Sequence, residues 1–237
     1  LRGWLGLSGW LVAMSAAAEP VPLRLLTFHE PPWVDATERP AQGVTVEVIK
    51  RLFAEAGIAY SLETLPLKRA LLMATSRPNT CVFPVERSQE REASLRWVGP
   101  VVVSRYAFYP AADRRISLQT LEDARRYRIG SYLGSGLGEY LEQRGFKVTL
   151  MANPGQGPSM LARNRFDLWV SDTHSARATA AAAGVAIGEP ALVFLTTLRA
   201  MGCHPDTPDS SLELLQNTLL RLLRSGALKG MVYAEPD

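Results

Sequence analysis

A helix followed directly by a strand is encoded in residues 44–65, which read VTVEVIKRLFAEAGIAYSLETL. Apolar side chains recur at helical spacing over residues 44–56, and Gly57 then provides a typical stop for a helix. Over residues 59–65 apolar and polar residues alternate, as in a strand with one buried face. A helical period that gives way to a strand period within so few residues indicates an α/β fold.

The same alternation of helices and strands extends on both sides of that stretch. A strand is expected at residues 22–28, a helix at 66–74 and a strand at 80–85, the last being apolar except at its start. Strand, helix, strand, helix and strand in succession predict a parallel sheet with helices against its faces.

A second series of elements starts near Val101. We expect strands at 101–109, 127–132, 147–151 and 166–170, and helices at 118–125, 136–144, 159–164 and 173–183. A long apolar segment, residues 192–203, and an amphipathic helix, residues 209–223, end the series. The simplest arrangement is two α/β lobes, with the chain crossing from the first lobe to the second and then returning.

Length and composition are those of a folded protein, with 237 residues, an apolar fraction of 47% and a charged fraction of 21%. These values exclude a disordered tail and a fibre. The 26 basic and 23 acidic residues are interspersed. Proteins that bind nucleic acids gather their basic residues on one face or in a short run, so we expect no nucleic-acid partner.

The first eighteen residues have the pattern of a secretory signal peptide. Arg2 is the only charge before Glu19, residues 3–14 are apolar, and an Ala-x-Ala exit ends at Ala18. The apolar stretch is shorter than the roughly 20 residues that cross a bilayer. We predict cleavage after Ala18 and an exported protein; a buried N-terminal helix is the alternative.

Two cysteines, Cys81 and Cys203, lie far apart in the sequence. An oxidising compartment outside the cytoplasm would let them form a disulfide. They could equally be two buried thiols that act as small apolar side chains. The residues alone leave both interpretations open.

Polar or flexible residues follow four of the predicted strands, in residues 29–33, 84–91, 132–138 and 171–174. In α/β sheets, ligands bind where loops leave the carboxyl ends of the strands. Arg91 could therefore hold a carboxylate through two parallel hydrogen bonds. An exposed helix start with weak Glu–Arg pairs is the other interpretation of the same loop.

Three more features of these loops each have two interpretations. The glycine-rich segment 134–138 either cradles an anion with its backbone N–H groups or makes a tight turn. Asp172 either caps the following helix or accepts a hydrogen bond from a cationic ligand. Trp33 either forms a wall of an apolar cleft or stacks on a cation.

The spacings typical of catalytic and metal sites are missing from the sequence. His29, His174 and His204 are scattered and do not have the spacing of metal ligands. The glycines and serine of residues 134–136 do not have the spacing of a nucleophile elbow. We therefore predict no metal, no cofactor and no enzymatic activity.

Several short motifs, taken in order, resemble the family 3 solute-binding proteins of bacterial ABC transporters. These motifs are Pro31-Pro32-Trp33, Gly43-Val44, Ser88-Gln89-Glu90-Arg91, Trp97-Val98-Gly99-Pro100, Gly134-Ser135-Gly136 and residues 167–172. The resemblance covers essentially all of the chain after residue 18. It implies an α/β, two-lobed periplasmic-binding-protein fold of type II, in which each lobe is a mostly parallel sheet flanked by helices and two hinge strands join the lobes.

The same resemblance implies where the lobes begin and end. Residues 19–104 and 196–237 would form the first lobe, and residues 105–195 the second. The strand of Cys81 would then lie beside the strand of Cys203, which favours the disulfide.

Eight site residues carry over from the resemblance by position. Arg91 matches the arginine that holds the ligand's α-carboxylate, and Ser135 and Gly136 match the helix-start amides that share it. Asp172 matches the acid that takes the α-ammonium group, and Trp33 the aromatic residue that lines the first lobe.

The remaining positions depart from the family pattern. Pro84 and Glu86 stand where the family offers a backbone carbonyl and a hydroxyl, and a carboxylate at Glu86 favours a cationic group. Tyr132 stands where some members have a charged residue. The first loop has His29 and Glu30 in place of the usual Asp.

The implied function is periplasmic capture of a small polar ligand, an amino acid or a related compound, by closure of two lobes. The partners would be this solute and an ABC-transporter permease, and the protein would be a monomer. One alternative is an enzyme on the same scaffold, similar to periplasmic dehydratases of cyclohexadienyl acids, with Glu86 or His29 as general acid. Another is a binding protein that reports its ligand to a receptor.

Overall fold

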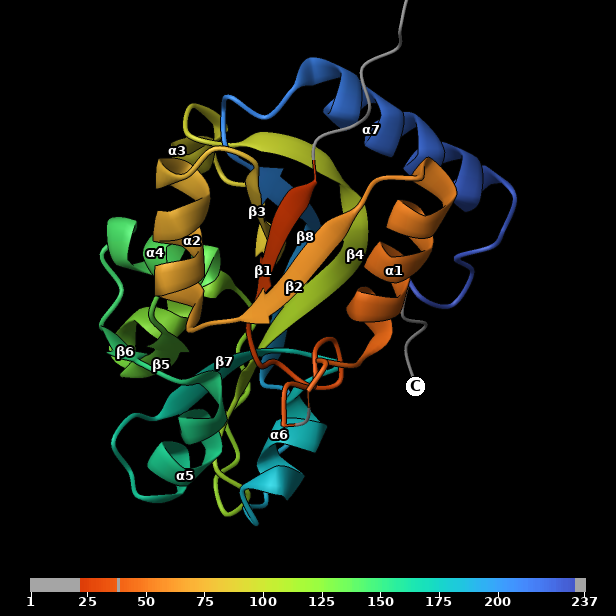
Figure 1. The fold of residues 1–237 in the computed structure, drawn as a ribbon. Helices are drawn as coiled ribbons and strands as arrows, with labels where there is room; N and C mark the ends of the chain where they lie inside the picture. Colours follow the sequence, from red (N-terminus) through yellow and green to blue (C-terminus); the bar gives the residue numbers. More distant parts are fainter. Residues whose placement is uncertain (1–21, 38, 233–237) are drawn as a thin grey trace, which may run out of the picture.

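The structure is a computed structural model and describes residues 22–37 and 39–232. The expected signal peptide lies outside these residues. Figure 1 shows two lobes. The first contains β1 (Leu23–Thr27), α1 (Val44–Ala56), β2 (Tyr60–Thr64), α2 (Leu67–Ser76), β3 (Thr80–Glu86), α3 (Gln89–Glu92) and α7 (Asp209–Arg224).

The second lobe follows the same alternation of strands and helices. It contains η1 (Leu121–Arg126), β5 (Ile129–Tyr132), α4 (Gly136–Gln143), β6 (Val148–Met151), η2 (Pro154–Gln156), α5 (Gly157–Ala162), β7 (Leu168–Asp172) and α6 (Ala176–Ala182). Here η1 and η2 are short 3-10 helices. Two long strands, β4 (Arg96–Tyr109) and β8 (Leu192–Cys203), belong to both lobes.

In the described part of the chain, eight strands form one sheet in the order β2-β1-β3-β8-β4-β7-β5-β6. The outer strands are parallel within each lobe, since β1 pairs with β2 and β3, and β5 pairs with β6 and β7. The central strands are antiparallel, since β8 pairs with β3 and β4, and β4 pairs with β7.

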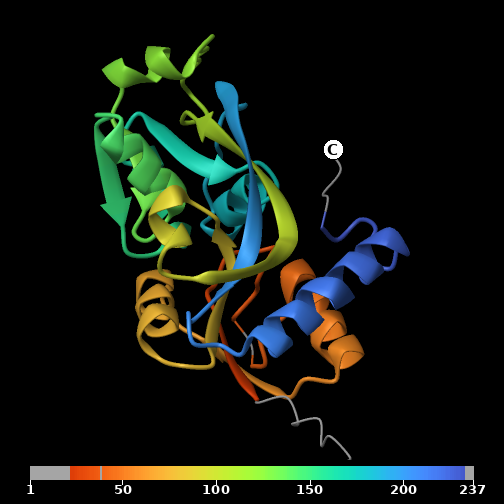
Figure 2. The same ribbon diagram turned by 90° about the horizontal axis from the view of Figure 1, so that it is seen from above.

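The two central strands carry the sheet from one lobe into the other, and Figure 2 shows them running side by side. Their ladder extends from the Arg96–Cys203 pair to the Phe108–Leu192 pair. The register shifts twice along β4, between Val98 and Val102 and again between Tyr106 and Ala107. Such irregularities bend a strand and increase its twist.

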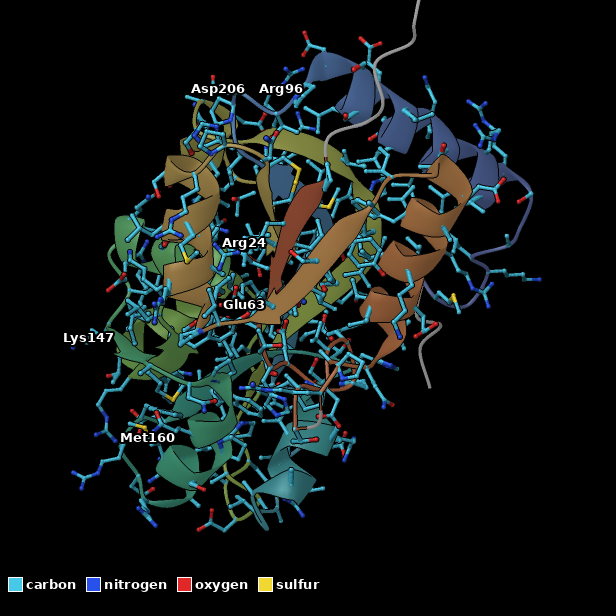
Figure 3. All side chains as sticks on the ribbon, viewed as in Figure 1. Arg24, Glu63, Arg96, Lys147, Met160 and Asp206 are labelled. Carbon is cyan, nitrogen blue, oxygen red and sulfur yellow. A yellow bond between two sulfur atoms is a disulfide. The ribbon has the colours of Figure 1, made fainter. Side chains whose placement is uncertain are left out.

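The core explains the leucines of the first strand. Leu23 and Leu25 of β1 pack with α1 and α7 on one face of the sheet, while Leu26 packs with α2 on the other. A parallel strand that is covered on both faces carries mostly apolar residues. Figure 3 shows Arg24 of β1 beside Glu63 of β2, with which it forms an ion pair at the edge of this core.

Cys81 and Cys203 form a disulfide, which decides between the two interpretations that the sequence left open. The two residues face each other in the register of β3 and β8, and both are fully buried. The cross-link joins segments that are 122 residues apart in the sequence.

Sequence and structure differ at three places in the fold. The two predicted sheets are joined into one, because β4 and β8 pair along most of their length. The strand predicted to start at Val101 starts at Arg96. Asp172 is the last residue of β7, where it pairs with Tyr106, so it does not follow the strand. None of the helices in residues 22–37 and 39–232 is long and apolar enough to cross a membrane.

Candidate functional site

Loops from the two lobes meet at the junction between them. Trp33, after β1, donates a hydrogen bond from its Nε1 to Oδ1 of Asp172, at the end of β7, over 3.1 Å. Tyr132, at the end of β5, donates from its hydroxyl to Oε1 of Glu30 over 3.2 Å. The carboxyl ends of strands in both lobes therefore face one another, which is where ligands bind in such sheets.

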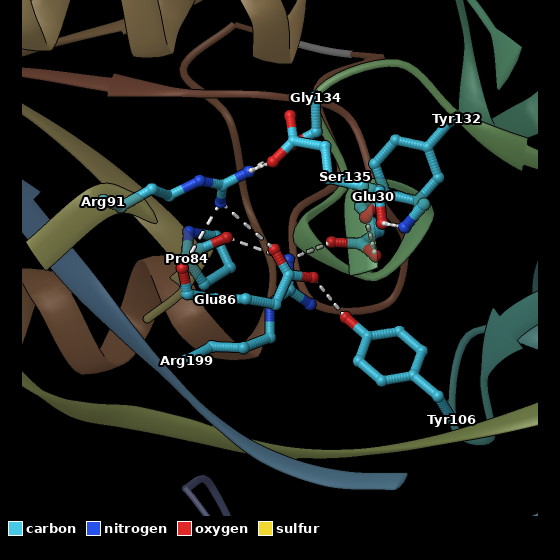
Figure 4. Close-up of polar contacts among 11 residues, drawn as sticks. Glu30, Pro84, Glu86, Arg91, Tyr106, Tyr132, Gly134, Ser135 and Arg199 are labelled. Atoms are coloured by element: carbon cyan, nitrogen blue, oxygen red, sulfur yellow. Dashed lines mark hydrogen bonds and ion pairs between the residues drawn. The ribbon is translucent and has the colours of Figure 1, made fainter. Parts of the chain in front are cut away.

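The eight residues expected from the sequence all lie at this junction or directly beside it. Four of them, Pro84, Glu86, Arg91 and Trp33, come from the first lobe. The others come from the second lobe: Tyr132, Ser135, Gly136 and Asp172. Figure 4 shows Pro84, Glu86, Arg91, Tyr132 and Ser135 with the polar contacts around them.

Arg91 is buried, and its guanidinium contacts acceptors of the protein itself. Nη2 donates to the carbonyl of Gly134 over 2.9 Å and to Oε2 of Glu139 over 3.0 Å, both in the second lobe. Nη1 donates to the carbonyl of Glu86 over 3.3 Å and lies 3.6 Å from Oε2 of the same residue. The exposed helix start that was the alternative for this loop is therefore wrong for Arg91.

The start of α4 fits closely against this arginine. Ser135 is the N-cap, and its Oγ accepts a hydrogen bond from the N–H of Gly138. A Cβ atom at Gly136 would lie 3.2 Å from Cβ of Glu86 and 3.5 Å from Nη1 of Arg91. Gly136 thus allows a close approach between the two lobes.

Asp172 orders the loop before α6, whose N-cap is Ser175. Its Oδ1 accepts from the N–H groups of His174 and Ser175, over 2.9 Å and 3.2 Å, as well as from Trp33. Its Oδ2 is buried and has no hydrogen-bond partner among the described residues. One oxygen orders the loop, and the other remains as an acceptor.

Sequence reasoning missed a second arginine, Arg199 of β8. It is fully buried, and its Nη2 donates to Oε2 of Glu30 over 2.5 Å and to the carbonyl of Pro84 over 2.8 Å. Its Nε and Nη1 have no acceptor within residues 22–37 and 39–232. A lone charge in the apolar run 192–203 was the available signal, because a buried charge requires a partner.

Glu86 completes the group of buried charges. Its Oε1 accepts from the hydroxyl of Tyr106 over 2.5 Å, and its Oε2 has no hydrogen-bond partner in the described part of the chain. Burial acts to raise the pKa of Glu86, but Arg199 and Arg91 more than offset it, so the pKa lies below its ordinary value. Glu86 is therefore charged at neutral pH.

Glu30 behaves differently from Glu86. Burial raises its pKa from 4.5 to about 7, against the lowering effect of Arg199. Burial acts to lower the pKa of Arg199 as well, but Glu30 and the other groups around it hold that pKa above its ordinary value. Glu30 is thus the acid of this site whose charge changes near neutral pH.

Cavities open on two sides of these charges. One of about 340 Å³ is lined by Glu30, Tyr132, Trp169 and Ser175, whose Oγ is buried and without a partner among the described residues. The other, of about 490 Å³, is lined by Glu86 and by the start of α4. Both lie in the size range of small-molecule sites. In the part of the chain that the structure describes, no group of His, Cys, Asp and Glu side chains is arranged to hold a metal ion.

Comparison with known proteins identifies the architecture. A histidine kinase sensor domain with similarity to periplasmic binding proteins has a TM-score of 0.80 and 15% identity, over 90% of this chain and 94% of that one. A mutant of ArgBP from T. maritima has a TM-score of 0.76 and 17% identity, over 89% and 93%. The chain has the two-lobed periplasmic-binding-protein fold.

A third protein with this periplasmic-binding-protein fold is an ancestral arginine-binding protein bound to arginine. Its TM-score is 0.74 and its identity 20%, over 89% of this chain and 96% of that one. No protein-family model matches the sequence, and no curated protein matches it. Similarity to solved structures therefore shows the fold, and the ligand must be inferred from the site.

Proposed function

We propose that this protein captures a small polar solute, of the amino-acid type or related to it, between its two lobes. The observation that carries the proposal is the set of buried polar atoms at the junction that lack partners among the described residues. Oε2 of Glu86 and Oδ2 of Asp172 are the acidic members of this set. Buried polar atoms without hydrogen-bond partners cost free energy, so they favour a polar molecule that fills the junction.

The wider proposal is that of a family 3 solute-binding protein of a bacterial ABC transporter. Its first lobe would comprise residues 19–104 and 196–237, and its second lobe residues 105–195. The protein would be a periplasmic monomer, exported by a signal peptide that is cleaved after Ala18, and would deliver its solute to a permease. Each of the three similar structures is a binding or sensor domain, which supports binding over catalysis.

Thermal unfolding against a panel of solutes tests the capture. The panel contains amino acids, polyamines, small peptides and cyclohexadienyl acids. A ligand that binds only the folded state stabilises it by about 2.7 kcal/mol at a hundredfold excess over its dissociation constant. We expect one class of solutes to raise the unfolding temperature, and a panel without any shift would contradict the proposal.

Variants connect that shift with the site. Glu86→Gln and Asp172→Asn each remove a charged acceptor at the junction, and we expect each to weaken binding at least tenfold. Asp113→Asn and Glu213→Gln are matched controls, because both of these acids are exposed on the surface. If the controls and the site variants weaken binding equally, the ligand binds elsewhere.

Sensing is a second candidate, since one similar structure is the sensor domain of a histidine kinase. Uptake of the identified solute by cells that lack this protein separates the two roles. Loss of uptake supports transport. Normal uptake, together with a lost cellular response to the solute, supports sensing.

A further inference from the structure

We propose that the captured solute is a small organic cation without a carboxylate, such as an alkyl diamine or a guanidino amine. This inference rests on the proposed function, because it concerns the ligand of the same site. It departs from an ordinary amino-acid ligand, whose carboxylate would need a free cationic partner in the site.

Arg91 is not free to hold a ligand carboxylate. Its Nη2 already donates to Oε2 of Glu139 and to the carbonyl of Gly134, and its Nη1 lies beside Glu86. Two carboxylates of the chain therefore take the place that the carboxylate of an amino acid would occupy. Glu139 comes from the second lobe, so this contact also joins the two lobes.

The space beside Arg91 is filled as well. A single added Cβ atom at Gly136 would already lie 3.2 Å from Glu86 and 3.5 Å from Arg91. A carboxylate group is larger than one carbon atom. The start of α4 is therefore packed closely against Glu86 and Arg91, which leaves little room there for a ligand carboxylate.

Arg199 does not replace Arg91 in that role. Its Nε and Nη1 have no acceptor among the described residues, but the side chain has no exposed surface. It lines neither the cavity of about 340 Å³ nor the one of about 490 Å³. Its Nη2 donates to Glu30 and to the carbonyl of Pro84, so Arg199 stabilises Glu30 from the interior of the protein.

The junction instead offers negative charge. Within the described residues, Glu86 and Glu139 contact Arg91, Glu30 contacts Arg199, and Asp172 accepts a hydrogen bond from Trp33. Even with Glu30 neutral, the remaining three carboxylates outnumber the two guanidinium groups, with Glu139 partly exposed. An excess of negative charge at the junction favours a cation that brings the compensating charge.

The cavity of about 340 Å³ has the chemistry for such a cation. It is lined by the carboxyl group of Glu30, the rings of Tyr132 and Trp169, and the hydroxyl of Ser175. Aromatic faces and acidic oxygens both attract organic cations. His29 also lines this cavity, and its Nδ1 accepts a hydrogen bond from the N–H of Ala36 over 3.1 Å.

Pairs of compounds that differ by one carboxylate test the inference. Agmatine is arginine without its carboxylate, and cadaverine is lysine without its carboxylate. Dissociation constants are measured by calorimetry at pH 7.5, with glutamine and glutamate as further probes. In at least one pair we expect the amine to bind ten times or more tightly than its amino acid.

A variant of Glu139 tests the reason for that preference. Glu139→Gln removes a carboxylate from Arg91, so the amino acid should gain about tenfold in affinity relative to its amine. Glu142→Gln is the matched control, because Glu142 is exposed on the same helix α4. The control should leave the ratio unchanged, and circular dichroism checks that both variants are folded.

The other outcomes separate this inference from the proposed function. If in both pairs the amino acid binds as tightly as its amine or more tightly, or if only glutamine or glutamate binds, the inference is wrong and solute capture stands. An unchanged ratio in Glu139→Gln contradicts the role given to Arg91. If none of these compounds nor any other solute of the panel binds, solute capture and the inference both fail.

Discussion

The two ends of the β3–β8 pair differ in nearly every property although they share one ladder of hydrogen bonds. At one end Cys81 faces Cys203 within an apolar core, and the two residues are covalently joined. At the other end Glu86 faces Arg199 among buried charges at the junction of the lobes. One pair of strands thus contributes stability at one end and the candidate site at the other.

The largest expected effect concerns the disulfide at one end of the β3–β8 pair. Replacing both cysteines, as in Cys81→Ala with Cys203→Ala, releases a loop of 122 residues in the unfolded chain. We expect the free energy of unfolding in urea to fall by about 5 kcal/mol, with ligand affinity unchanged.

The reduced wild-type protein is the control for that variant. Under reducing conditions the wild type should lose the same stability and the variant should lose none. A clear loss of ligand affinity in the variant would show that the two ends of the ladder are not independent.

The next largest effect on stability is expected at the other end of the β3–β8 pair, where Glu86 faces Arg199. Arg199→Met removes one partner of a buried ion pair and leaves the acids around it without compensation. The free energy of unfolding should fall by about 4 kcal/mol.

Arg96→Met is the comparison for Arg199→Met, because Arg96 lies on the neighbouring strand β4 but pairs with Asp209 at the surface. Exposed pairs contribute at most about 1 kcal/mol. Equal losses in urea unfolding for the two variants would contradict the buried role of Arg199.

A smaller effect is expected from pH. Glu30 has a pKa of about 7 in the folded protein and 4.5 as its ordinary value, so the folded state binds more protons between these limits. Stability should therefore fall as the pH rises through this range, by about 3 kcal/mol, because the two pKa values differ by about 2.5. The charges of Glu86 and Asp172 raise the pKa of Glu30 further, and the charge of Arg199 lowers it.

Unfolding in urea at pH 5 and at pH 8 measures this dependence. Glu30→Gln keeps an oxygen for Arg199 but cannot titrate, so its stability should change less between the two pH values. A slope equal to that of the wild type would assign the dependence to another group.

The apolar end was predictable from the sequence because periodicity reports burial. The helix at 44–56 was predicted with the bounds that the structure has, and the long apolar segment predicted at 192–203 is the strand β8. The parallel pairing of the outer strands in each lobe also follows from the alternation of elements along the chain.

The charged end was only partly predictable. Glu86, Arg91 and Asp172 lie at or just after the ends of apolar strands, and this position identified them. Arg199 lies inside such a strand, where the apolar pattern hid it. Contacts such as those of Tyr106 with Glu86 and of Glu139 with Arg91 depend on how the two lobes meet, which local spacing does not encode.

The continuous ladder of β4 and β8 has a mechanical consequence. Both strands cross from one lobe to the other, so pulling the lobes apart along the strands would stretch two backbones at once, whereas bending or twisting the ribbon keeps its hydrogen bonds. The β4–β8 ribbon therefore lets the two lobes rotate relative to each other and keeps them from separating. The ribbon bends most easily at the two register shifts. One of these shifts adjoins Tyr106, whose hydroxyl donates to Glu86. A contact made with the Glu86 carboxylate therefore acts directly beside the point where the ribbon bends.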